Sequence, residues 1–378
     1  MPAMTCALVE RLQTIPDPRR PSENLKHLLV DLIILGLCGV VAGCEDFVEI
    51  AQWGQVNEPC LRTFLAVPHG IASHDTFTRV FALLPPATGP AVLVPWLVDR
   101  RGAPGDYVHV DGKTLRGTRC QCQKLKALQV GSAWAGPSGI TLGQVAVAAK
   151  ANEITALPAL LKLLDLHEKI VTSEAMGCQK AIAETIVEGG GSYILAVKDN
   201  PPTVPAEIQA AFVQAPAPKL RSARVATTWD KGHGRQEQRT VQAVPAHEYL
   251  SAAQGALWLG VLSVVMVTRE VWCQATGAQS TEVSYVLSSL PPNARRIGRA
   301  IRGHWRIENG LPWVLDVVFR EDARRVSERT TAENVALLTR LALSLLRGDP
   351  SKDSMTVKRK LAGWSIPYLA QLLGFPST

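Results

Sequence analysis

An acid flanked by basic side chains marks residues 107–117 as a candidate for phosphate chemistry. The first residues of this segment are β-branched and aromatic, which predicts a buried strand that carries Asp111 to its end. Gly112 allows the chain to turn and brings Lys113 and Arg116 beside the acid. A carboxylate in such a place can hold a divalent metal ion against a phosphate group. The alternative is an aspartate that only stabilises a turn.

A second candidate segment is a strongly basic helix expected over residues 295–309. Spacings of three and four residues put His304, Trp305 and Glu308 on one face, while arginines that include Arg302 form a separate flank. Glu308 would then supply a further carboxylate and the arginine flank would contact phosphates. Two simpler interpretations stay open, namely that Glu308 pairs with arginines and that Trp305 packs in the core.

The elements between these segments predict how the acids are brought together. We expect three strands in a meander, then a helix, a strand, a helix and a strand, at residues 107–111, 128–135, 140–149, 153–166, 169–172, 179–188 and 193–197. This is the order of a ribonuclease-H-like sheet, in which the first and fourth strands are neighbours. Because Glu174 follows the fourth strand, the order predicts that Asp111 and Glu174 meet.

A β-rich insertion at about residues 201–290 interrupts this order. Its strands are expected at residues 224–229, 236–244, 257–270 and 281–288. Insertions of this length in an α/β core are usually functional. The predicted α/β domain as a whole spans residues 104–347 and is followed by a C-terminal tail at residues 348–378.

The chain before this core predicts a helical domain at residues 1–103. Helices are expected there at residues 25–42, 46–53 and 73–84. We interpret the triplet Ser73-His-Asp75 as a helix N-cap, because the members of a catalytic triad meet in space and seldom adjoin in sequence. The fold class expected for the whole chain is therefore a mixed ribonuclease-H-like sheet with helices on both faces, interrupted by the insertion and preceded by an α-helical domain.

The bulk properties narrow the class of partner. A net charge of +7 and a pI near 9.0 favour an anionic partner, nucleic acid first, although a merely soluble basic protein has the same balance. The 8 cysteines include no pair at zinc-ligand spacing, so neither a structural zinc site nor a disulfide scaffold is indicated and the cytosol is favoured. The most apolar stretch, residues 28–41, contains Asp31 and is shorter than the roughly 20 residues of a membrane span, so we expect a buried helix and no membrane partner.

Motifs along nearly the whole chain resemble bacterial insertion-sequence transposases of the DDE class, and the H-repeat-associated group in particular. The motifs that carry the resemblance are Asp17-Pro-Arg19, Leu37-Cys-Gly-Val-Val-Ala-Gly43, Gly70-Ile-Ala-Ser-His-Asp-Thr-Phe77, Asp111-Gly-Lys-Thr-Leu-Arg116, Asn152-Glu-Ile-Thr155, Ala175-Met-Gly-Cys-Gln179, His304-Trp-Arg-Ile-Glu-Asn309 and Val314-Leu-Asp-Val-Val-Phe-Arg-Glu-Asp322. The resemblance implies a ribonuclease-H-like fold and metal-dependent DNA strand cleavage and transfer. It assigns Asp111, Glu174 and Glu308 as the catalytic acids that bind Mg²⁺, for which Mn²⁺ can substitute.

Further residues and partners follow from the same resemblance. The expected contacts to DNA are Lys113, Arg116, Lys198, Arg302, His304, Trp305 and Asn309. The helical domain at residues 1–103 would bind the terminal repeats of the element, and pairing of two ends implies a dimer on DNA. Target DNA is the other partner, and the protein is expected in the bacterial cytoplasm, at the nucleoid when bound to DNA.

The sequence departs from the family pattern at three positions around the predicted site. Glu174 stands where the family has aspartate, and its extra methylene moves the carboxylate by roughly 1.5 Å, against a tolerance of about 0.5 Å in productive sites. Pro312 stands where the family usually has histidine and is expected to kink the helix at Glu308, while Gln129 replaces another expected histidine. Three functions therefore stay open: an active transposase, a DNA-binding remnant without catalysis, and a nuclease of the same fold.

Overall fold

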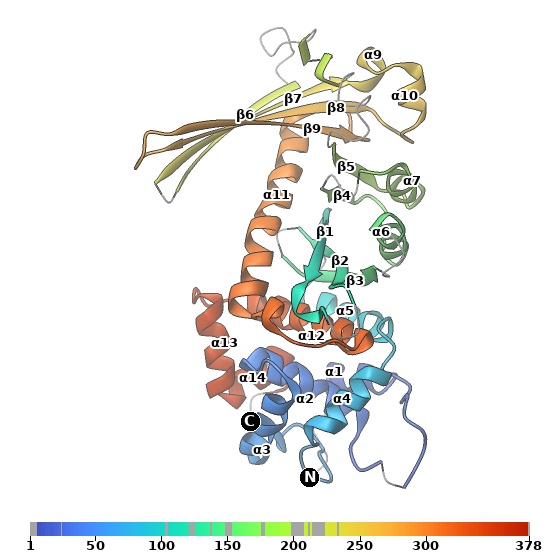
Figure 1. Ribbon diagram of the computed structural model, residues 1–378, viewed down its shortest axis with the longest axis vertical. Helices are drawn as coiled ribbons and strands as arrows, with labels where there is room; N and C mark the ends of the chain where they lie inside the picture. Colours follow the sequence, from blue (N-terminus) through green and yellow to red (C-terminus); the bar gives the residue numbers. More distant parts are fainter. Residues whose placement is uncertain are drawn as a thin grey trace. The chain divides into compact units, whose positions relative to one another are not determined.

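The computed structural model describes residues 6–23, 25–102, 105–120, 125–136, 138–147, 153–174, 178–197, 208–210, 212–213, 224–232 and 234–376 (Figure 1). The chain forms two compact units. Unit 1 comprises Met1–Gly105, Gly112–Lys150 and Asn309–Thr378, and unit 2 comprises Asp106–Asp111 and Ala151–Glu308. Strand β1 and helix α11 each contribute residues to both units.

Unit 1 is mainly helical. Its helices are α1 (Ala7–Leu12), α2 (Leu29–Ala42), α3 (Phe47–Leu61), α4 (His74–Leu83), α5 (Thr88–Arg101), α12 (Arg329–Gly348), α13 (Met355–Trp364) and α14 (Ile366–Leu373). Helix α2 is buried almost throughout and packs against α3, α12, α13 and α14. The apolar stretch at residues 28–41 is thus a core helix, as its length and its single acid predicted.

Local signals in the sequence explain where these helices begin and end. Gly43 ends α2 with a φ of +116°, a conformation that glycine adopts without steric cost. Asp46 caps α3 by accepting a hydrogen bond from the Glu49 backbone N–H. The predicted end of α3 at residue 53 is wrong, because the helix runs to Leu61 and includes Pro59.

Strand β1 corrects the prediction that the chain turns at Gly112. Strand β1 runs from Tyr107 to Leu115, so Asp111 lies within a strand and the chain does not turn at Gly112. The turn comes later, in a 3₁₀ turn at Arg116–Thr118. Gly117 is required there, because a Cβ atom would lie 2.0 Å from the carbonyl oxygen of Arg324. Strands β2 (Leu128–Ala135) and β3 (Thr141–Val147) form the predicted antiparallel hairpin and pack against α12.

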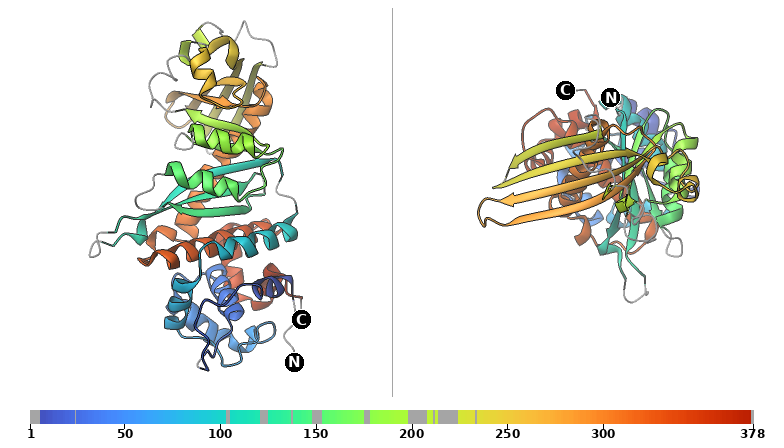
Figure 2. Two further views of the ribbon diagram at one scale, coloured as in Figure 1. Left: turned by 90° about the vertical axis from the view of Figure 1, so that its right-hand side faces the viewer. Right: turned by 90° about the horizontal axis from the view of Figure 1, so that it is seen from above.

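Unit 2 is built on three parallel strands. Strand β4 (Ile170–Ser173) lies between β1 and β5 (Ser192–Val197), and both pairings are parallel. Helices α6 (Glu153–Lys162) and α7 (Lys180–Glu188) pack together on one side of these strands, and α11 (Ala294–Trp313) lies on the other (Figures 1 and 2). Since β4 is covered on both faces, all four of its residues are buried.

The β-rich insertion extends the sheet of unit 2. It contains β6 (Val225–Gly232), β7 (Arg235–Pro245), β8 (Ser263–Cys273) and β9 (Gln279–Ser288), which lie side by side in Figure 2. Strand β9 pairs antiparallel with β5, and the full hydrogen-bonded order is β3-β2-β1-β4-β5-β9-β8-β7-β6. The strand predicted over residues 257–270 is displaced: it begins at Ser263, after the short helices α9 (Ala246–Tyr249) and α10 (Ala252–Ala256).

Helix α11 continues through Pro312 instead of ending there. It runs to Trp313 and passes into a π-helical turn at Val314–Val318, followed by a 3₁₀ turn at Glu321–Ala323. Proline has no N–H to donate to the carbonyl of Glu308, so one bond of the regular ladder is missing at this point. Irregular turns of the π type are frequent near functional sites.

The fold class is a mixed α/β architecture, as predicted, with parallel pairing in the centre of unit 2 and antiparallel pairing in the insertion. Among the described residues, no single helix has the length and apolar character to cross a membrane. Helices α4 and α5 pass that test only as a pair, and they are bent by 97° at their junction.

Candidate active site

The pairing of β1 with β4 brings two of the predicted acids side by side. The last registered pair in this parallel ladder is Val110 with Ser173. The next residue on β1 is Asp111, and Glu174 directly follows the end of β4. Neighbouring strands are about 4.8 Å apart, so the two residues start from adjacent positions at the same end of the ladder. Both are partly buried. This register agrees with the predicted adjacency of the two strands, and the meeting of the Asp111 and Glu174 carboxylates stays a prediction.

Helix α11 covers the face of the sheet that carries these acids. Ile297 and Ile301 of α11 pack in one buried cluster with Ile170 of β4 and Ile194 of β5, and Tyr107 of β1 packs against it. Side chains two residues apart on a strand share a face. Asp111 and Glu174 therefore lie on the side of β1 and β4 that faces α11, which also carries the third predicted acid.

A chain of polar side chains is buried beneath the acids. The Thr172 hydroxyl lies 2.6 Å from Nδ1 of His109 and 3.0 Å from Nδ1 of His304. All three residues are buried. Burial, with a smaller contribution from His304, lowers the pKa of His109 to about 3. Burial also lowers the pKa of His304, and the charge of Glu174 opposes that shift. Both imidazoles are therefore neutral near pH 7.

Three of the predicted DNA contacts in unit 2 are engaged by the protein itself. Arg302 forms an ion pair with Asp230 of β6. The guanidinium carbon of Arg239, on β7, lies 5.1 Å from the centre of the Trp305 ring, which packs against the core cluster of unit 2. His304 is bound to Thr172. The packing interpretation of Trp305 is thus the one that matches its position.

Two further predicted DNA contacts lie in unit 1 beside carboxylates. Lys113 forms an ion pair with Asp316 and lies 3.7 Å from Glu321 and 3.9 Å from Asp322. The exposed Arg116 lies 3.5 Å from Asp322. The positive charge of both side chains is therefore balanced within unit 1.

Part of the predicted site falls outside the described residues. Lys198 is one such residue, and for Glu308 and Asn309 only the backbone of α11 is described. Among the described residues, no group of three or more histidine, cysteine, aspartate or glutamate side chains could hold a metal ion. A three-carboxylate site would need the side chain of Glu308.

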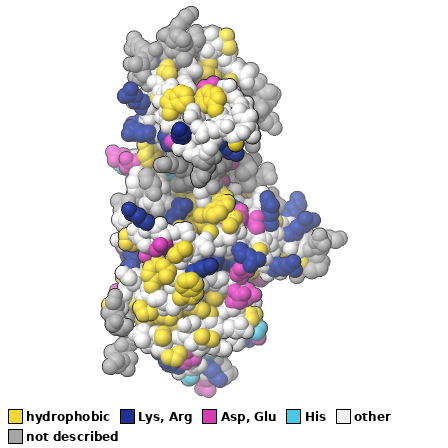
Figure 3. Space-filling view, turned by 90° about the vertical axis from the view of Figure 1, so that its left-hand side faces the viewer, with side chains coloured by type: hydrophobic (Ala, Val, Ile, Leu, Met, Phe, Trp, Pro, Cys, Tyr) yellow, Lys and Arg dark blue, Asp and Glu magenta, His cyan; other side chains and the backbone are white. Residues whose placement is uncertain are grey.

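The exposed cations among the described side chains of α11 belong to its first turns. Arg295, Arg296 and Arg299 are exposed, and none of them forms an ion pair with another described residue. Figure 3 shows lysine and arginine side chains in several separate groups on the face in view. These arginines can therefore contact phosphates without losing an ion pair to another described residue.

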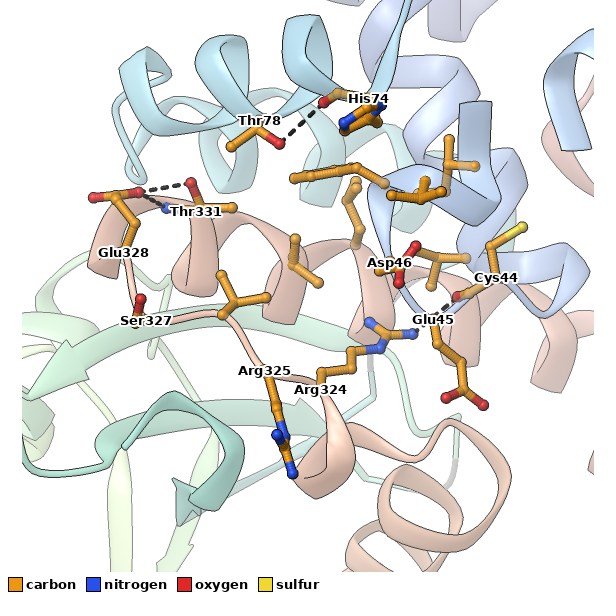
Figure 4. Close-up of a pocket in the computed structure, with 17 residues that line it drawn as sticks. Cys44, Glu45, Asp46, His74, Thr78, Arg324, Arg325, Ser327, Glu328 and Thr331 are labelled. Atoms are coloured by element: carbon orange, nitrogen blue, oxygen red, sulfur yellow. Dashed lines mark hydrogen bonds between the residues drawn. The ribbon is translucent and has the colours of Figure 1, made fainter. Parts of the chain in front are cut away.

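Unit 1 contains a cavity of about 320 Å³ between α3, α4 and the segment that leads into α12 (Figure 4). Several polar groups around it already have hydrogen-bond partners within unit 1: Glu328 caps α12 by accepting from Thr331, Thr78 donates to the carbonyl of His74, and Arg324 donates to the carbonyl of Cys44. None of the predicted acids lines the cavity.

His109, Thr172 and Asp230 were not among the residues predicted from the sequence. A signal for the first two was present, because a polar residue stands two positions before each of Asp111 and Glu174 in strands that are otherwise apolar. Nothing in the sequence near Asp230 indicates its partner, since Arg302 lies 72 residues further along the chain.

The comparisons with known proteins agree on a class. Residues 9–97 match a family model described as DDE_Tnp_1-associated, and residues 103–345 match one described as Transposase DDE domain. The Escherichia coli O157:H7 protein named "Putative transposase YncI" is 32% identical over 370 residues, which are 97% of this chain and 94% of that protein. The protein of strain K12 named "H repeat-associated putative transposase YhhI" is 32% identical over 372 residues, 97% of either chain.

A solved structure of a piggyBac transposase synaptic complex with hairpin DNA aligns with 98% of this chain and 78% of its own. Its TM-score is 0.38 and its identity 9%, a likeness too low to bear on fold or function. The family models and the Escherichia coli relatives carry the assignment instead.

The chain belongs to the DDE transposase family. Members of this family are polynucleotidyl transferases of insertion sequences and related mobile elements, and they generally use divalent metal ions. The resemblance inferred from the motifs, including the link to H-repeat-associated transposases, is confirmed.

Proposed function

We propose that this protein is a DNA transposase that binds the ends of its insertion sequence and performs metal-dependent strand cleavage and transfer. The observation that supports this proposal most directly is the register of β1 and β4, which sets Asp111 and Glu174 on adjacent parallel strands at one end of their ladder. A pair of carboxylates in that position is the donor chemistry that Mg²⁺ prefers. The catalytic part would be a ribonuclease-H-like domain at residues 104–347.

In this proposal Asp111, Glu174 and Glu308 hold Mg²⁺, for which Mn²⁺ can substitute. The donor set fits a hard cation, because it consists of carboxylates and Glu174 forms no ion pair with any described residue. When bound, the metal ions would activate the attacking oxygen and stabilise the leaving oxygen. The protein's own contribution is to hold the carboxylates in place and to orient the DNA.

The DNA contacts would be divided between the two units. The helical domain at residues 1–103 would bind the terminal repeats, and target DNA would meet the basic residues near the acids. Arg295, Arg296 and Arg299 are the described cations of α11 that can reach phosphates without breaking an ion pair. Two ends held together imply a dimer on DNA, in the bacterial cytoplasm and at the nucleoid.

A second function is favoured by Glu174, namely that of a DNA-binding remnant without cleavage. Its carboxylate stands one methylene further from β4 than an aspartate would, a displacement of roughly 1.5 Å. Octahedral Mg²⁺ accommodates such a displacement poorly. The hydrogen bond missing at Pro312, on the helix that carries Glu308, would further displace the carboxylates from the geometry that Mg²⁺ needs.

The test uses the full-length protein and a duplex made from the DNA that flanks its gene. Nicking and strand joining are measured in Mg²⁺ and in Mn²⁺ for the natural chain, for Glu174→Asp and for Asp111→Asn. Binding of the same duplex is measured against salt concentration for all three.

Cleavage by the natural chain that is lost in Asp111→Asn supports an active transposase. Cleavage by Glu174→Asp alone supports a site that is intact except for its longer acid, and hence the remnant. Cleavage that survives in Asp111→Asn would overturn the proposed metal site. Products that are hydrolysed but never joined would indicate a nuclease.

A further inference from the structure

We propose that His109, Thr172 and His304 form a positioning layer that fixes the three predicted acids relative to one another. This inference rests on the proposed function and names residues that act through the acids without touching DNA or metal. The layer joins β1, β4 and α11. Asp111 lies in β1, Glu174 directly follows β4, and Glu308 lies in α11.

The offsets between the layer and the acids are regular. His109 is two residues before Asp111, and Thr172 is two residues before Glu174. Two residues are one period of a strand, so each pair shares a face. His304 is four residues before Glu308, about one turn of α11, which again gives a shared face. Each acid therefore stands one structural repeat beyond a member of the layer.

The register of the sheet adds a second constraint. His109 is the direct partner of Thr172 in the β1–β4 ladder, and Thr172 is in turn the partner of Ile194 on β5. Registered residues in parallel strands point to the same face, so the hydroxyl and both imidazoles meet between the sheet and α11. A shift of α11 along the sheet would break the bond from His304 to Thr172.

The hydroxyl of Thr172 can form hydrogen bonds to both imidazoles in only two arrangements. It donates one proton and accepts others, so it donates to one imidazole and accepts an N–H from the other. Nε2 of His304 is buried and forms no hydrogen bond within the described part of the chain. A bare nitrogen lone pair is tolerated more readily there than an N–H. His304 therefore donates from Nδ1 to Thr172, and Thr172 donates to His109.

Close packing leaves the layer little freedom. Gly303 on α11 lies against the His109 ring, and a Cβ atom at this position would be 3.2 Å from Cε1 and Nε2 of His109. The rings of His109 and His304 are 5.7 Å apart. The helix thus approaches β1 as closely as a residue without a side chain permits.

Carboxylates that bind metal ions need such support. A catalytic constellation must be held within about 0.5 Å of its productive geometry, and the groups behind the ligands provide this. Loss of one such group typically costs 10- to 100-fold in metal affinity or activity. One more rotatable bond separates the carboxylate of Glu174 from β4 than would separate that of an aspartate. The Glu174 carboxylate therefore needs more support from neighbouring groups to keep its position.

The test compares three variants of the full-length protein bound to the duplex of its own flanking DNA. Thr172→Val removes the hydroxyl at nearly constant volume, and Thr172→Ser keeps it. Thr185→Val is the matched control, because Thr185 is also buried in unit 2, but the one bond of its hydroxyl to a described residue goes to the carbonyl of Ala181 in its own helix. Mn²⁺ binding is measured from the loss of the free Mn²⁺ signal in electron paramagnetic resonance. Hydrogen exchange of the amides in β4 and α11 and the melting temperature are recorded alongside.

We expect Thr172→Val to weaken Mn²⁺ binding by about 10-fold or more and to speed exchange in α11, while Thr172→Ser stays within about 3-fold of the natural chain. Thr185→Val should lower the melting temperature without a change in Mn²⁺ affinity. Equal Mn²⁺ affinity in the natural chain and Thr172→Val would overturn the positioning layer. If the natural chain and Asp111→Asn both fail to bind Mn²⁺, the metal site itself is wrong, and the inference fails with it.

Discussion

Two groups of carboxylates, one in each unit, are embedded in opposite ways. In unit 1, Asp316, Glu321 and Asp322 surround Lys113, and Glu321 also forms a buried ion pair of 2.7 Å with Arg340. In unit 2, the residues directly beneath Asp111 and Glu174 are a neutral hydroxyl and two neutral imidazoles. The acids of unit 1 therefore pair with lysine and arginine side chains, whereas the polar groups next to the acids of unit 2 are uncharged.

The difference separates acids that stabilise a fold from acids that can accept a cation. A carboxylate with a buried arginine has its charge compensated on folding and gains nothing from a metal ion. Glu174, next to the neutral layer, forms no ion pair with another described residue, and we expect it to accept a cation. Sequence motifs alone marked both groups, since Asp111 and Asp322 each lie in a segment that matches the transposase family.

The largest effect that would test this contrast is on catalysis. Asp111→Asn keeps the size of the side chain and removes the charge, so strand cleavage should fall by roughly 1,000-fold or more while the melting temperature changes little. Cleavage rates with the flanking duplex and thermal unfolding of the same preparations give the two values. A large loss of stability without loss of cleavage would place Asp111 with the structural acids.

The matching change in unit 1 should act on stability. Arg340 is 1% exposed, and Arg340→Leu leaves Glu321 buried without its arginine, at a cost of about 3–5 kcal/mol of unfolding free energy. The double variant Arg340→Leu/Glu321→Leu should recover a large part of that loss. Denaturant unfolding of the two variants provides the comparison, and equal losses would show that the ion pair is not the source.

A smaller effect is expected where α11 meets β1. Gly303→Ala adds a methyl group 3.2 Å from the His109 ring, so the helix must move by a few tenths of an ångström. Cleavage should fall by about 3- to 10-fold, since a displacement of 1 Å costs on the order of 100-fold. Gly298→Ala, on the same helix, places its Cβ atom 3.2 Å from Val241 and serves as the control for packing strain alone. A similar loss of cleavage in both variants would contradict the prediction.

The smallest effect concerns an acid in unit 1 with neither a metal role nor an ion pair in the described structure. Burial raises the pKa of Asp31, although the carboxylate accepts a hydrogen bond of 2.8 Å from the Val67 N–H. The folded state therefore binds the Asp31 proton more tightly than the unfolded chain does. As the pH rises above the pKa that Asp31 has in the unfolded chain, ionisation of this carboxyl group lowers the stability of the fold. Asp31→Asn should raise the melting temperature at pH 7 by on the order of 1–2 °C, with a difference that shrinks toward pH 4. A melting-temperature difference that grows as the pH falls would contradict this prediction.

Much of the fold follows from local signals in the sequence. The hairpin of β2 and β3, the end of α2 at residue 42, the start of α3 near residue 46, and the alternation of β4, α7 and β5 were predicted because each is fixed by residues close together in the chain. The adjacency of β1 and β4 was predicted from the order of elements, and it brings Asp111 and Glu174 to neighbouring positions.

What was missed depends on contacts between distant residues. The strand through Asp111 continues to Leu115, although Gly112 favoured a turn. The ion pair of Arg302 with Asp230 and the bond from Thr172 to His304 join segments 72 and 132 residues apart. Of the side chains expected to contact DNA, Arg302, His304 and Trp305 contact Asp230, Thr172 and Arg239, and their contact with DNA stays a prediction. The role of Glu308 stays a prediction.

The separation of Thr172 from His304 also sets an order of events during synthesis. A ribosome that adds roughly 5–20 residues per second needs about 7 to 26 seconds to make the 132 residues between them. During that interval β1 and β4 can pair, but the hydroxyl and the His109 ring have no helix to cover them. Under the proposed function, a chain that ends before residue 304 would pair β1 with β4 but would lack both His304 and Glu308, so we expect that it would not cleave DNA.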